Sequence, residues 1–273
     1  MAKGGIGRRP LAQLLYGLGI VLVTIGIFIA PAYFILLYLK SLSFVAYVIV
    51  GAVLLKVSFS VKELRRAALS VKRLLREDKL AEAHFELRSL VSRDTAELDK
   101  SQMVSATVES VAENSCDSFV APLFYFLLFG VPGAIGYRVV NTLDAMIGYH
   151  GEWEHLGKFA ARLDDVVNFI PARITALIIV LAAWLCRKNV SGAWQIMLRD
   201  HKKTQSPNAG WTMSAIAGAL GVQLEKVSHY RLGDNHYPLS PNTIDASLQM
   251  ITVVALIWSL ISILAEVMYL VTT

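Results

Sequence analysis

Acidic side chains recur at helical spacing in the middle of the chain, directly before a long apolar run. Four-residue intervals place three carboxylates on one face of a helix predicted over residues 104–117: those of Glu109, Glu113 and Asp117. Like charges at this spacing repel one another. A Mg²⁺ ion that also holds phosphate oxygens would relieve that repulsion. An acidic solvated face, or an acidic cap paired with Arg93 and Lys100, explains the same pattern without a ligand.

A second polar set follows, in which acids, amides and arginines alternate. Asn141 and Asp144 are three residues apart and share a helix face, and Asn168 follows Asp164 by four residues and Asp165 by three. Arginines flank these acids at positions 138, 162 and 173. Acids that hold a cation beside guanidinium groups that bind phosphate or carboxylate would form an anion and metal clamp. A buried salt-bridge network that ties helices together is the alternative.

A third polar segment, Ser206-Pro207-Asn208, follows a basic stretch and could present a hydroxyl and an amide to an anion. The same tripeptide is also an ordinary turn. The chain contains no Walker A sequence, no nucleotide-binding glycine fingerprint and no serine-nucleophile elbow. A nucleotide would therefore bind in a site of another kind.

The elements that must position these residues are membrane helices. Hydrophobic residues make up 55% of the chain and charged residues 17%, and the formal net charge is +5. We attribute the positive balance to cytoplasmic loops rather than to nucleic-acid binding, since no basic repeat or zinc-finger spacing accompanies it.

Apolar runs of spanning length predict the fold class. The sequence indicates an all-α, polytopic integral membrane protein with about four to five spanning helices, a broken or re-entrant segment and membrane-surface helices. The runs cover residues 11–39, 44–59, 118–136, 174–186 and 250–271, of which the third is interrupted by Gly130-Val-Pro-Gly and the fourth needs residues 166–172 to reach full length. Residues 211–222 are apolar but short, which indicates a re-entrant or buried piece.

Basic residues set the predicted orientation and organisation. Lys3, Arg8 and Arg9 place the amino terminus in the cytoplasm, and the first two runs form a hairpin, residues 11–59, that returns the chain there. Residues 62–79 are basic with leucine and alanine at helical spacing, which fits a membrane-surface helix or a solvated helical face. We expect one integral membrane domain over residues 1–273, with a cytoplasmic helical segment at 60–117 and a motif-bearing membrane core at 118–273.

These segments together resemble one family. The motifs that carry the resemblance are Val91-Ser-Arg-Asp-Thr, Val108-Glu-Ser-Val-Ala-Glu-Asn, Ala121-Pro-Leu-Phe-Tyr, Asn141-Thr-Leu-Asp-Ala-Met-Ile-Gly-Tyr, Ala161-Arg-Leu-Asp-Asp-Val-Val-Asn, Pro171-Ala-Arg, Ser206-Pro-Asn-Ala-Gly-Trp, Ala217-Gly-Ala-Leu-Gly-Val-Gln-Leu and Tyr230-Arg-Leu-Gly. In order and spacing they resemble the membrane-bound adenosylcobinamide-phosphate synthases of cobalamin biosynthesis, over roughly residues 60–260. Family members usually begin with a further apolar segment carrying Gly-Asp-Pro and His-Pro-Val motifs, whereas this chain starts Met1-Ala-Lys-Gly-Gly, as a short variant or a trimmed start would.

The resemblance implies a carbon–nitrogen ligase in the cell membrane. It would join the propionate carboxylate of adenosylcobyric acid to the amine of (R)-1-amino-2-propanol phosphate, or of a related amino alcohol, with ATP and Mg²⁺ as cofactors. Its partners would be this corrinoid substrate, the amino-alcohol phosphate and the lipid bilayer, and the resemblance leaves open a homo-oligomer or a complex with other corrinoid enzymes.

Our assignment of roles is a hypothesis within that resemblance. We assign catalysis to the carboxylates of Glu109, Glu113, Asp144, Asp164 and Asp165. Mg²⁺ would be held by Glu113, Asp117, Asp164 and Asp165. Substrate binding would fall to Arg93, Asn114, Arg138, Asn141, Arg162, Asn168, Arg173, Ser206, Asn208 and Arg231.

Two other classes of protein remain as alternatives. An intramembrane Mg²⁺-dependent prenyl- or phosphatidyl-type transferase also sets aspartates on helices, but such enzymes favour repeated Asp-xxx-Asp arrays that this sequence lacks. A non-catalytic corrinoid transporter or scaffold would also carry intramembrane polar residues. No repeated half is visible in the sequence to support a transporter.

Overall fold

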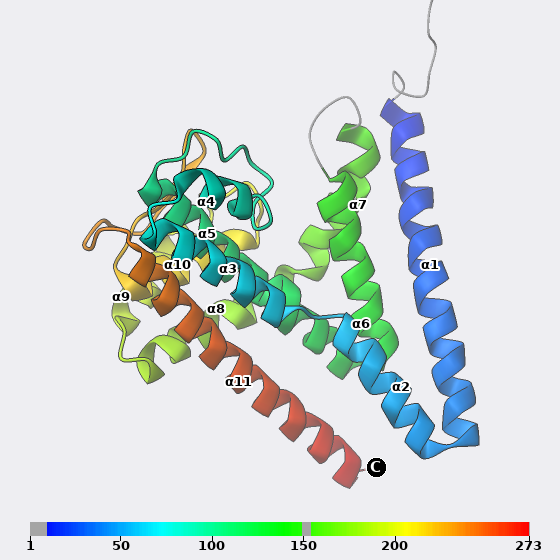
Figure 1. Cartoon of the computed structure of the whole chain (residues 1–273). Helices are drawn as coiled ribbons and strands as arrows, with labels where there is room; N and C mark the ends of the chain where they lie inside the picture. The colour runs from blue at the N-terminus through cyan, green and yellow to red at the C-terminus, as the bar shows by residue number, and fades with distance from the viewer. Residues whose placement is uncertain (1–9, 149–153, 273) are drawn as a thin grey trace, which may run out of the picture. The chain divides into compact units, whose positions relative to one another are not determined.

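The computed structural model describes residues 10–148 and 154–272. This part of the chain is almost entirely helical, as the predicted all-α class requires (Figure 1). The basic flank Lys3, Arg8 and Arg9, and His150, lie outside the described residues. Internal contacts divide the chain into two units: residues 1–59 with 121–168, and residues 60–120 with 169–273. The expectation of one domain over the whole chain stays a prediction.

The first unit contains four described helices: α1 (Pro10–Leu42), α2 (Phe44–Val57), α6 (Ala121–Ile147) and α7 (Glu154–Val167). The predicted hairpin is confirmed by α1 and α2, which meet at Ser43. The Ser43 hydroxyl caps α2 by accepting a hydrogen bond from the backbone N–H of Ala46. Pro31 lies inside α1 without ending it.

Glycine sets how closely the helices of the first unit approach. A Cβ atom built on Gly17 of α1 would overlap the backbone carbonyl of Leu156 in α7. One built on Gly136 of α6 would lie 2.7 Å from Cδ1 of Ile29 in α1. The backbones of α1 and α7 therefore touch at Gly17, where no side chain separates them.

The predicted break in the third apolar run is confirmed at Gly130. Its φ and ψ of 66° and −160° are non-helical, and Pro132 follows two residues later. Glycine adopts this backbone conformation readily because it has no Cβ atom, whereas residues with a side chain disfavour it. The second half of α6 is regular and carries Asn141 and Asp144 on one helix, as their spacing predicted.

The second unit contains helices α3 (Val61–Arg76), α4 (Leu80–Leu87), α5 (Lys100–Ser115), η2 (Cys116–Val120), α8 (Phe169–Leu185), α9 (Val190–Asp200), α10 (Ala209–Leu220) and α11 (Pro241–Thr272). Most residues of α5 and of α10 are buried, so these two helices form the core of the unit. The apolar segment predicted at 211–222 is accordingly a buried helix. The helix predicted over 62–79 is α3, which buries Ala68, Val71, Leu74 and Leu75.

A two-stranded hairpin in the second unit was not predicted. Strands β1 (Leu224–Lys226) and β2 (Tyr230–Leu232) pair antiparallel, with Leu224 opposite Leu232 and Lys226 opposite Tyr230. Leu224 and Leu232 are fully buried, which holds the hairpin against the helices. This placement brings Tyr230 into the interior of the unit.

The predicted number of spans is confirmed. Within the described residues, four helices are long and apolar enough to cross a membrane: Leu11–Leu42, Phe44–Arg76, Lys100–Ile147 and Pro241–Tyr269. The bent pair His155–Val167 and Phe169–Leu185 adds a fifth if it is one span. The chain therefore has the helices of a multi-pass membrane protein.

We predict that Gly17→Ala destabilises the protein by roughly 1–3 kcal/mol, because its methyl group must push α1 away from Leu156. Gly19→Ala in the same helix is the matched control, since nothing lies within 4 Å of its added Cβ. The control should be neutral or stabilising by up to about 1 kcal/mol through helix propensity. Thermal unfolding in detergent micelles measures both, and equal midpoints for the two variants would contradict the packing described.

Candidate functional site

The most polar group of the first unit lies where α6 and α7 meet, and we call Asn141, Asp144, Asp164, Asp165 and Asn168 the α6–α7 cluster. Both carboxylate oxygens of Asp164 accept a hydrogen bond. Asn141 Nδ2 donates to Oδ1 at 3.3 Å, and Asn168 Nδ2 donates to Oδ2 at 3.0 Å. The two predicted motifs are thus brought together around one acid.

Further donors fix the orientation of both amides. The buried Tyr137 hydroxyl donates to Asn168 Oδ1 at 2.8 Å, and Arg138 Nη1 donates to Asn141 Oδ1 at 3.4 Å. With each amide oxygen taken by a donor, each NH₂ group must face Asp164. Tyr137 was not among the predicted site residues, because only the packing of α6 on α7 reveals its role.

The α6–α7 cluster holds more negative than positive charge. Asp144 interacts electrostatically with both Asp164 and Asp165, and Arg162 approaches Asp165 at 3.8 Å. The Arg162 side chain is 74% exposed, so water screens much of its charge. Three carboxylates in one cluster favour a bound cation or proton.

Within the described residues, no three His, Cys, Asp or Glu side chains form a group that could hold a metal ion. Mg²⁺ commonly uses one or two carboxylates and completes its shell with water and phosphate oxygens. Excess acid in the α6–α7 cluster fits that donor set. The Mg²⁺ ligands named from the sequence stay a prediction.

In the second unit, Glu109 of α5 is the centre of a buried network. Its carboxylate accepts hydrogen bonds from Ser105 Oγ at 2.7 Å and Tyr230 Oη at 2.8 Å, and Arg93 Nη2 lies 3.4 Å away. Only 5% of Glu109 is exposed. One explanation of the acidic pattern was that an acid of this helix pairs with Arg93, and Glu109 does so.

Tyr230 is a site residue that the sequence did not single out. Burial raises the pKa of its hydroxyl, and the charge and hydrogen bond of Glu109 and the charge of Glu113 raise it further. Tyr230 therefore stays protonated and acts as a neutral donor beside two acids. Its position in the Tyr230-Arg-Leu-Gly motif was the available signal.

The three acids predicted to stack on one helix face do not all lie in α5. Helix α5 ends at Ser115, and Asp117 lies in the π-helical turn η2, whose winding is wider than the α-helical period that the spacing assumed. The stacking of Asp117 with the other two acids stays a prediction. The same turn carries Ser118, whose hydroxyl donates to Asn114 Oδ1 at 3.1 Å.

Asn114 lines a pocket of about 520 Å³ formed by α3, the end of α4, α5 and η2. Its Nδ2 donates to the backbone carbonyl of Ser110 at 3.0 Å. Among the predicted site residues, Asn114 alone is in the described lining of this pocket. Ser60, Ser89 and Ser118 add hydroxyls to the same wall.

Arg173 and Asn208, both predicted to bind substrate, lie together. Arg173 Nη1 donates to Asn208 Oδ1 at 3.2 Å. The guanidinium stacks over the ring of Phe169 at 3.5 Å and lies 4.9 Å from the Trp211 ring. Aromatic faces hold a guanidinium by its plane and leave N–H groups at its edge for an anion.

Two other predicted substrate residues have structural partners. Ser206 Oγ accepts from the backbone N–H groups of Asn208 and Ala209 at 3.2 and 3.4 Å, so it fixes the turn that precedes α10. Arg231 Nε donates to Glu225 Oε1 at 2.9 Å across the hairpin, with 68% of its side chain exposed.

A buried acid outside the predicted set is Asp200. It accepts hydrogen bonds from Arg199 Nε and from the backbone N–H of Gly233, each at 2.8 Å, and Lys203 Nζ lies at 2.6 Å. Burial raises the pKa of Asp200, but these donors outweigh burial and hold the pKa at about 2. With two cations on one carboxylate, this group ties α9 to the loop after β2.

The chain is similar to known proteins over almost its whole length. Residues 3–260 match the family model described as CobD/Cbib protein. A protein of Dehalococcoides mccartyi named Cobalamin biosynthesis protein CobD is 56% identical over 261 residues, which cover 96% of this chain and 83% of the relative.

More distant relatives match a shorter part. Probable cobalamin biosynthesis protein CobD of Methanothermobacter thermautotrophicus is 51% identical over 187 residues, 68% of this chain and 63% of the relative. Cobalamin biosynthesis protein CbiB of Salmonella typhi is 41% identical over 201 residues, 70% of this chain and 63% of the relative. The matches thus span less than two thirds of these two proteins. No solved structure matches the chain.

We predict that Asp200→Asn lowers the free energy of unfolding by roughly 2 kcal/mol at pH 7. A carboxylate with a depressed folded-state pKa stabilises the fold above its unfolded pKa, and this contribution disappears as pH falls through about 2. The difference from wild type should therefore shrink between about pH 4 and 2. Thermal unfolding across that range measures it.

Asp234→Asn is the matched control. Asp234 also accepts from Arg199, at 3.0 Å, but 43% of its side chain is exposed, so its loss should cost less than about 1 kcal/mol. Equal losses for the two variants, or a difference independent of pH, would contradict the account of Asp200.

Proposed function

Because the chain belongs to the CobD/CbiB family of cobalamin biosynthesis proteins, we propose that it is the ligase that forms adenosylcobinamide phosphate. The reaction joins the propionate carboxylate of adenosylcobyric acid to the amine of (R)-1-amino-2-propanol phosphate or a related amino alcohol. ATP supplies the driving force and leaves as ADP and phosphate. Family membership gives the pathway, and the excess of carboxylates in the α6–α7 cluster supports the chemistry.

The chemistry requires activation of a poor electrophile. In our scheme the propionate oxygen attacks the γ-phosphorus of ATP, ADP leaves, and an acyl phosphate forms. The amine nitrogen then attacks the acyl carbon, phosphate leaves, and a base takes the proton from nitrogen. The first step needs neutralisation of phosphate charge, and the second needs a carboxylate base close to the amine.

We assign both requirements to the α6–α7 cluster. Mg²⁺, when bound, would neutralise phosphate charge, with Asp164 and Asp144 as the acids that hold it. The amides of Asn141 and Asn168 hold the Asp164 carboxylate in place by donating to both of its oxygens. Asp165 takes the amine proton in this scheme, because 27% of its side chain is exposed and an incoming amine can reach it.

We assign substrate anions to the second unit. The Arg173 guanidinium, held over Phe169 beside Asn208, would bind a phosphate or carboxylate by its N–H edge. Asn114, on the wall of its pocket, would donate to the amides that rim a corrin ring. Glu109 and Tyr230 position α5 against the hairpin and thereby Glu113 beside them.

We further propose a location in the cell membrane with the amino terminus in the cytoplasm. The four or five apolar helices support the multi-pass membrane location. Lysine and arginine outnumber acids among residues 62–79, and such segments stay on the cytoplasmic side. ATP and the phosphorylated substrates are available on that side.

Reconstitution tests the proposed reaction. The purified protein in detergent receives ATP, Mg²⁺, adenosylcobyric acid and aminopropanol phosphate, and mass spectrometry follows the corrinoid while a coupled assay follows ADP. We expect corrinoid amide and ADP in equal amounts, both abolished by EDTA and restored by Mg²⁺. A folded preparation that forms neither product would overturn the proposal.

We predict that Asp164→Ala, Asp165→Ala and Glu113→Ala each lower turnover at least about tenfold, which corresponds to about 1.4 kcal/mol of barrier. Glu97→Ala is the control, since Glu97 is an exposed acid outside the described contacts of the site. Its turnover should match wild type. Normal turnover in all three site variants would instead identify the acids as a structural network.

A further inference from the structure

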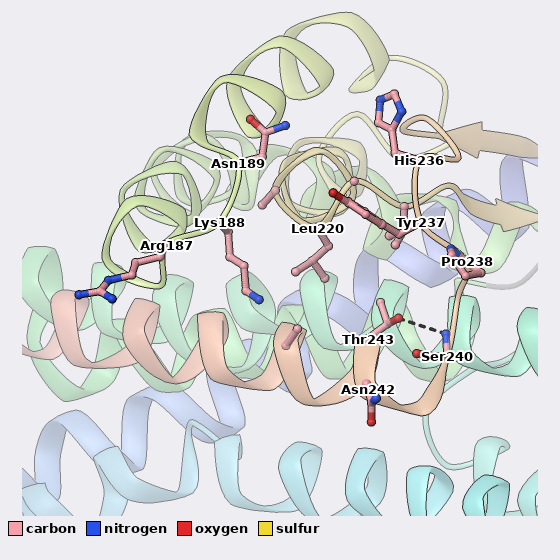
Figure 2. A pocket seen from close by; sticks show the side chains of 14 residues that line it. Arg187, Lys188, Asn189, Leu220, His236, Tyr237, Pro238, Ser240, Asn242 and Thr243 are labelled. Atoms are coloured by element: carbon pink, nitrogen blue, oxygen red, sulfur yellow. Dashed lines mark hydrogen bonds between the residues drawn. The ribbon is translucent and has the colours of Figure 1, made fainter.

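A pocket of about 730 Å³ lies in the second unit, where α8 and α10 end and α11 begins (Figure 2). The turn between α8 and α9 forms one wall through Arg187 and Lys188. The loop after β2 forms another through His236 and Tyr237, and the start of α11 closes it with Thr243. The proposed reaction uses none of these residues.

Backbone hydrogen bonds fix the turn that carries Arg187 and Lys188. The N–H of Arg187 donates to Trp184 O at 3.1 Å and that of Lys188 donates to Ala183 O at 2.8 Å, with φ of Arg187 at 54°. This pair of bonds is a Schellman motif, in which glycine usually takes the left-handed position. An arginine stands there despite the backbone strain.

The other walls are held equally firmly. The backbone N–H of Asn189 donates to Ala219 O at 3.2 Å, which joins the α8–α9 turn to α10. His236 and Tyr237 both donate their N–H groups to Gly221 O, at 3.2 and 3.0 Å. The pocket is therefore preorganised by main-chain contacts from three separate segments.

The charge of this pocket is positive and uncompensated. Its lining contains Arg187, Lys188 and His236 and no acidic residue. Over the described part of the chain, neither Arg187 nor Lys188 forms an ion pair. The acids nearest in sequence to the lining are occupied, Asp234 by Arg199 at 3.0 Å and Asp245 by Lys72 at 2.6 Å.

Hydrogen-bond donors converge on the same space. In Figure 2 the Lys188 side chain extends from its turn toward α11, whereas the Tyr237 ring lies across the end of α10 with its hydroxyl pointing away from the start of α11. The Ser240 backbone N–H already donates to Thr243 Oγ1 at 3.1 Å, which leaves the Thr243 hydroxyl hydrogen free to donate elsewhere. Arg187 extends outward at the rim.

The position of the pocket along the helices suits a boundary between membrane and water. It adjoins the end of α8 and the start of α11, both ends of candidate spans. Trp184 near the end of α8 and Tyr237 in the pocket lining are 63% and 66% exposed. Amphipathic aromatic rings at such depth mark the headgroup region.

We propose that this pocket is a binding site for a phosphate group, with Lys188 as its principal charge and the Thr243 hydroxyl as a further donor. Two kinds of molecule can supply a phosphate group at the membrane–water boundary: the headgroup of an anionic phospholipid and a soluble polyphosphate. The inference stands on the pocket alone and does not depend on the reaction proposed above.

Ligand-induced stabilisation tests the proposal, because a ligand that binds only the folded protein raises its unfolding midpoint. The full chain in dodecyl maltoside receives tripolyphosphate in one arm and phosphatidylglycerol in mixed micelles in the other, with phosphatidylcholine as the zwitterionic reference. A saturable rise in the tripolyphosphate arm identifies a soluble source. A rise specific to phosphatidylglycerol identifies a lipid source.

Matched variants locate the site. Lys188→Gln should require at least about tenfold more ligand for the same rise, since it loses a charge-assisted hydrogen bond. Lys188→Arg, which keeps the charge, should retain binding. Lys62→Gln removes the same charge from an exposed position outside the pocket and should behave as wild type. No saturable rise in either arm, or equal affinity of Lys188→Gln and Lys62→Gln, would overturn the proposal.

Discussion

A carboxylate removed from water needs hydrogen-bond donors or a cation, and both units of this chain are organised around that requirement. In the first unit, Asp164 receives one amide from α6 and one from the end of α7, which joins the two helices. In the second, Glu109 receives Ser105, Arg93 and Tyr230, and so ties α5 to the hairpin. Apolar surface builds these helices, but the buried acids fix which faces meet.

Buried acids in this chain are compensated to different degrees, and the difference separates structure from function. Asp200 has two cations and a backbone donor, so it is fully neutralised within the fold. The α6–α7 cluster brings Asp144, Asp164 and Asp165 into mutual repulsion with a largely exposed arginine as partner. A fold gains nothing from repulsion of this kind, whereas a site that takes up Mg²⁺ or a proton uses it.

Patterns within short stretches of sequence predicted much of the fold and part of the site. The apolar runs predicted the spans, and Gly130 predicted the break in α6. The four-residue spacing predicted that Asp164 and Asn168 lie on one helix face, where they form a hydrogen bond. Contacts between distant segments could not be predicted from local pattern. Tyr230 contacts Glu109, which is 121 residues away in the chain, because a hairpin carries it there. The strands of that hairpin are too short to show an alternation of polar and apolar residues. The π turn that contains Asp117 was not predicted either, because no residue pattern indicated that the α-helical period would change there.

We propose that the α6–α7 cluster keeps its charge for chemistry rather than for stability. Asp144→Asn separates these two roles, because the substitution conserves shape and removes one of three repelling charges. Thermal unfolding and turnover are measured on the same preparation. We expect an unchanged or higher unfolding midpoint together with turnover lowered at least about tenfold. A lower midpoint with normal turnover would show that the cluster serves stability instead.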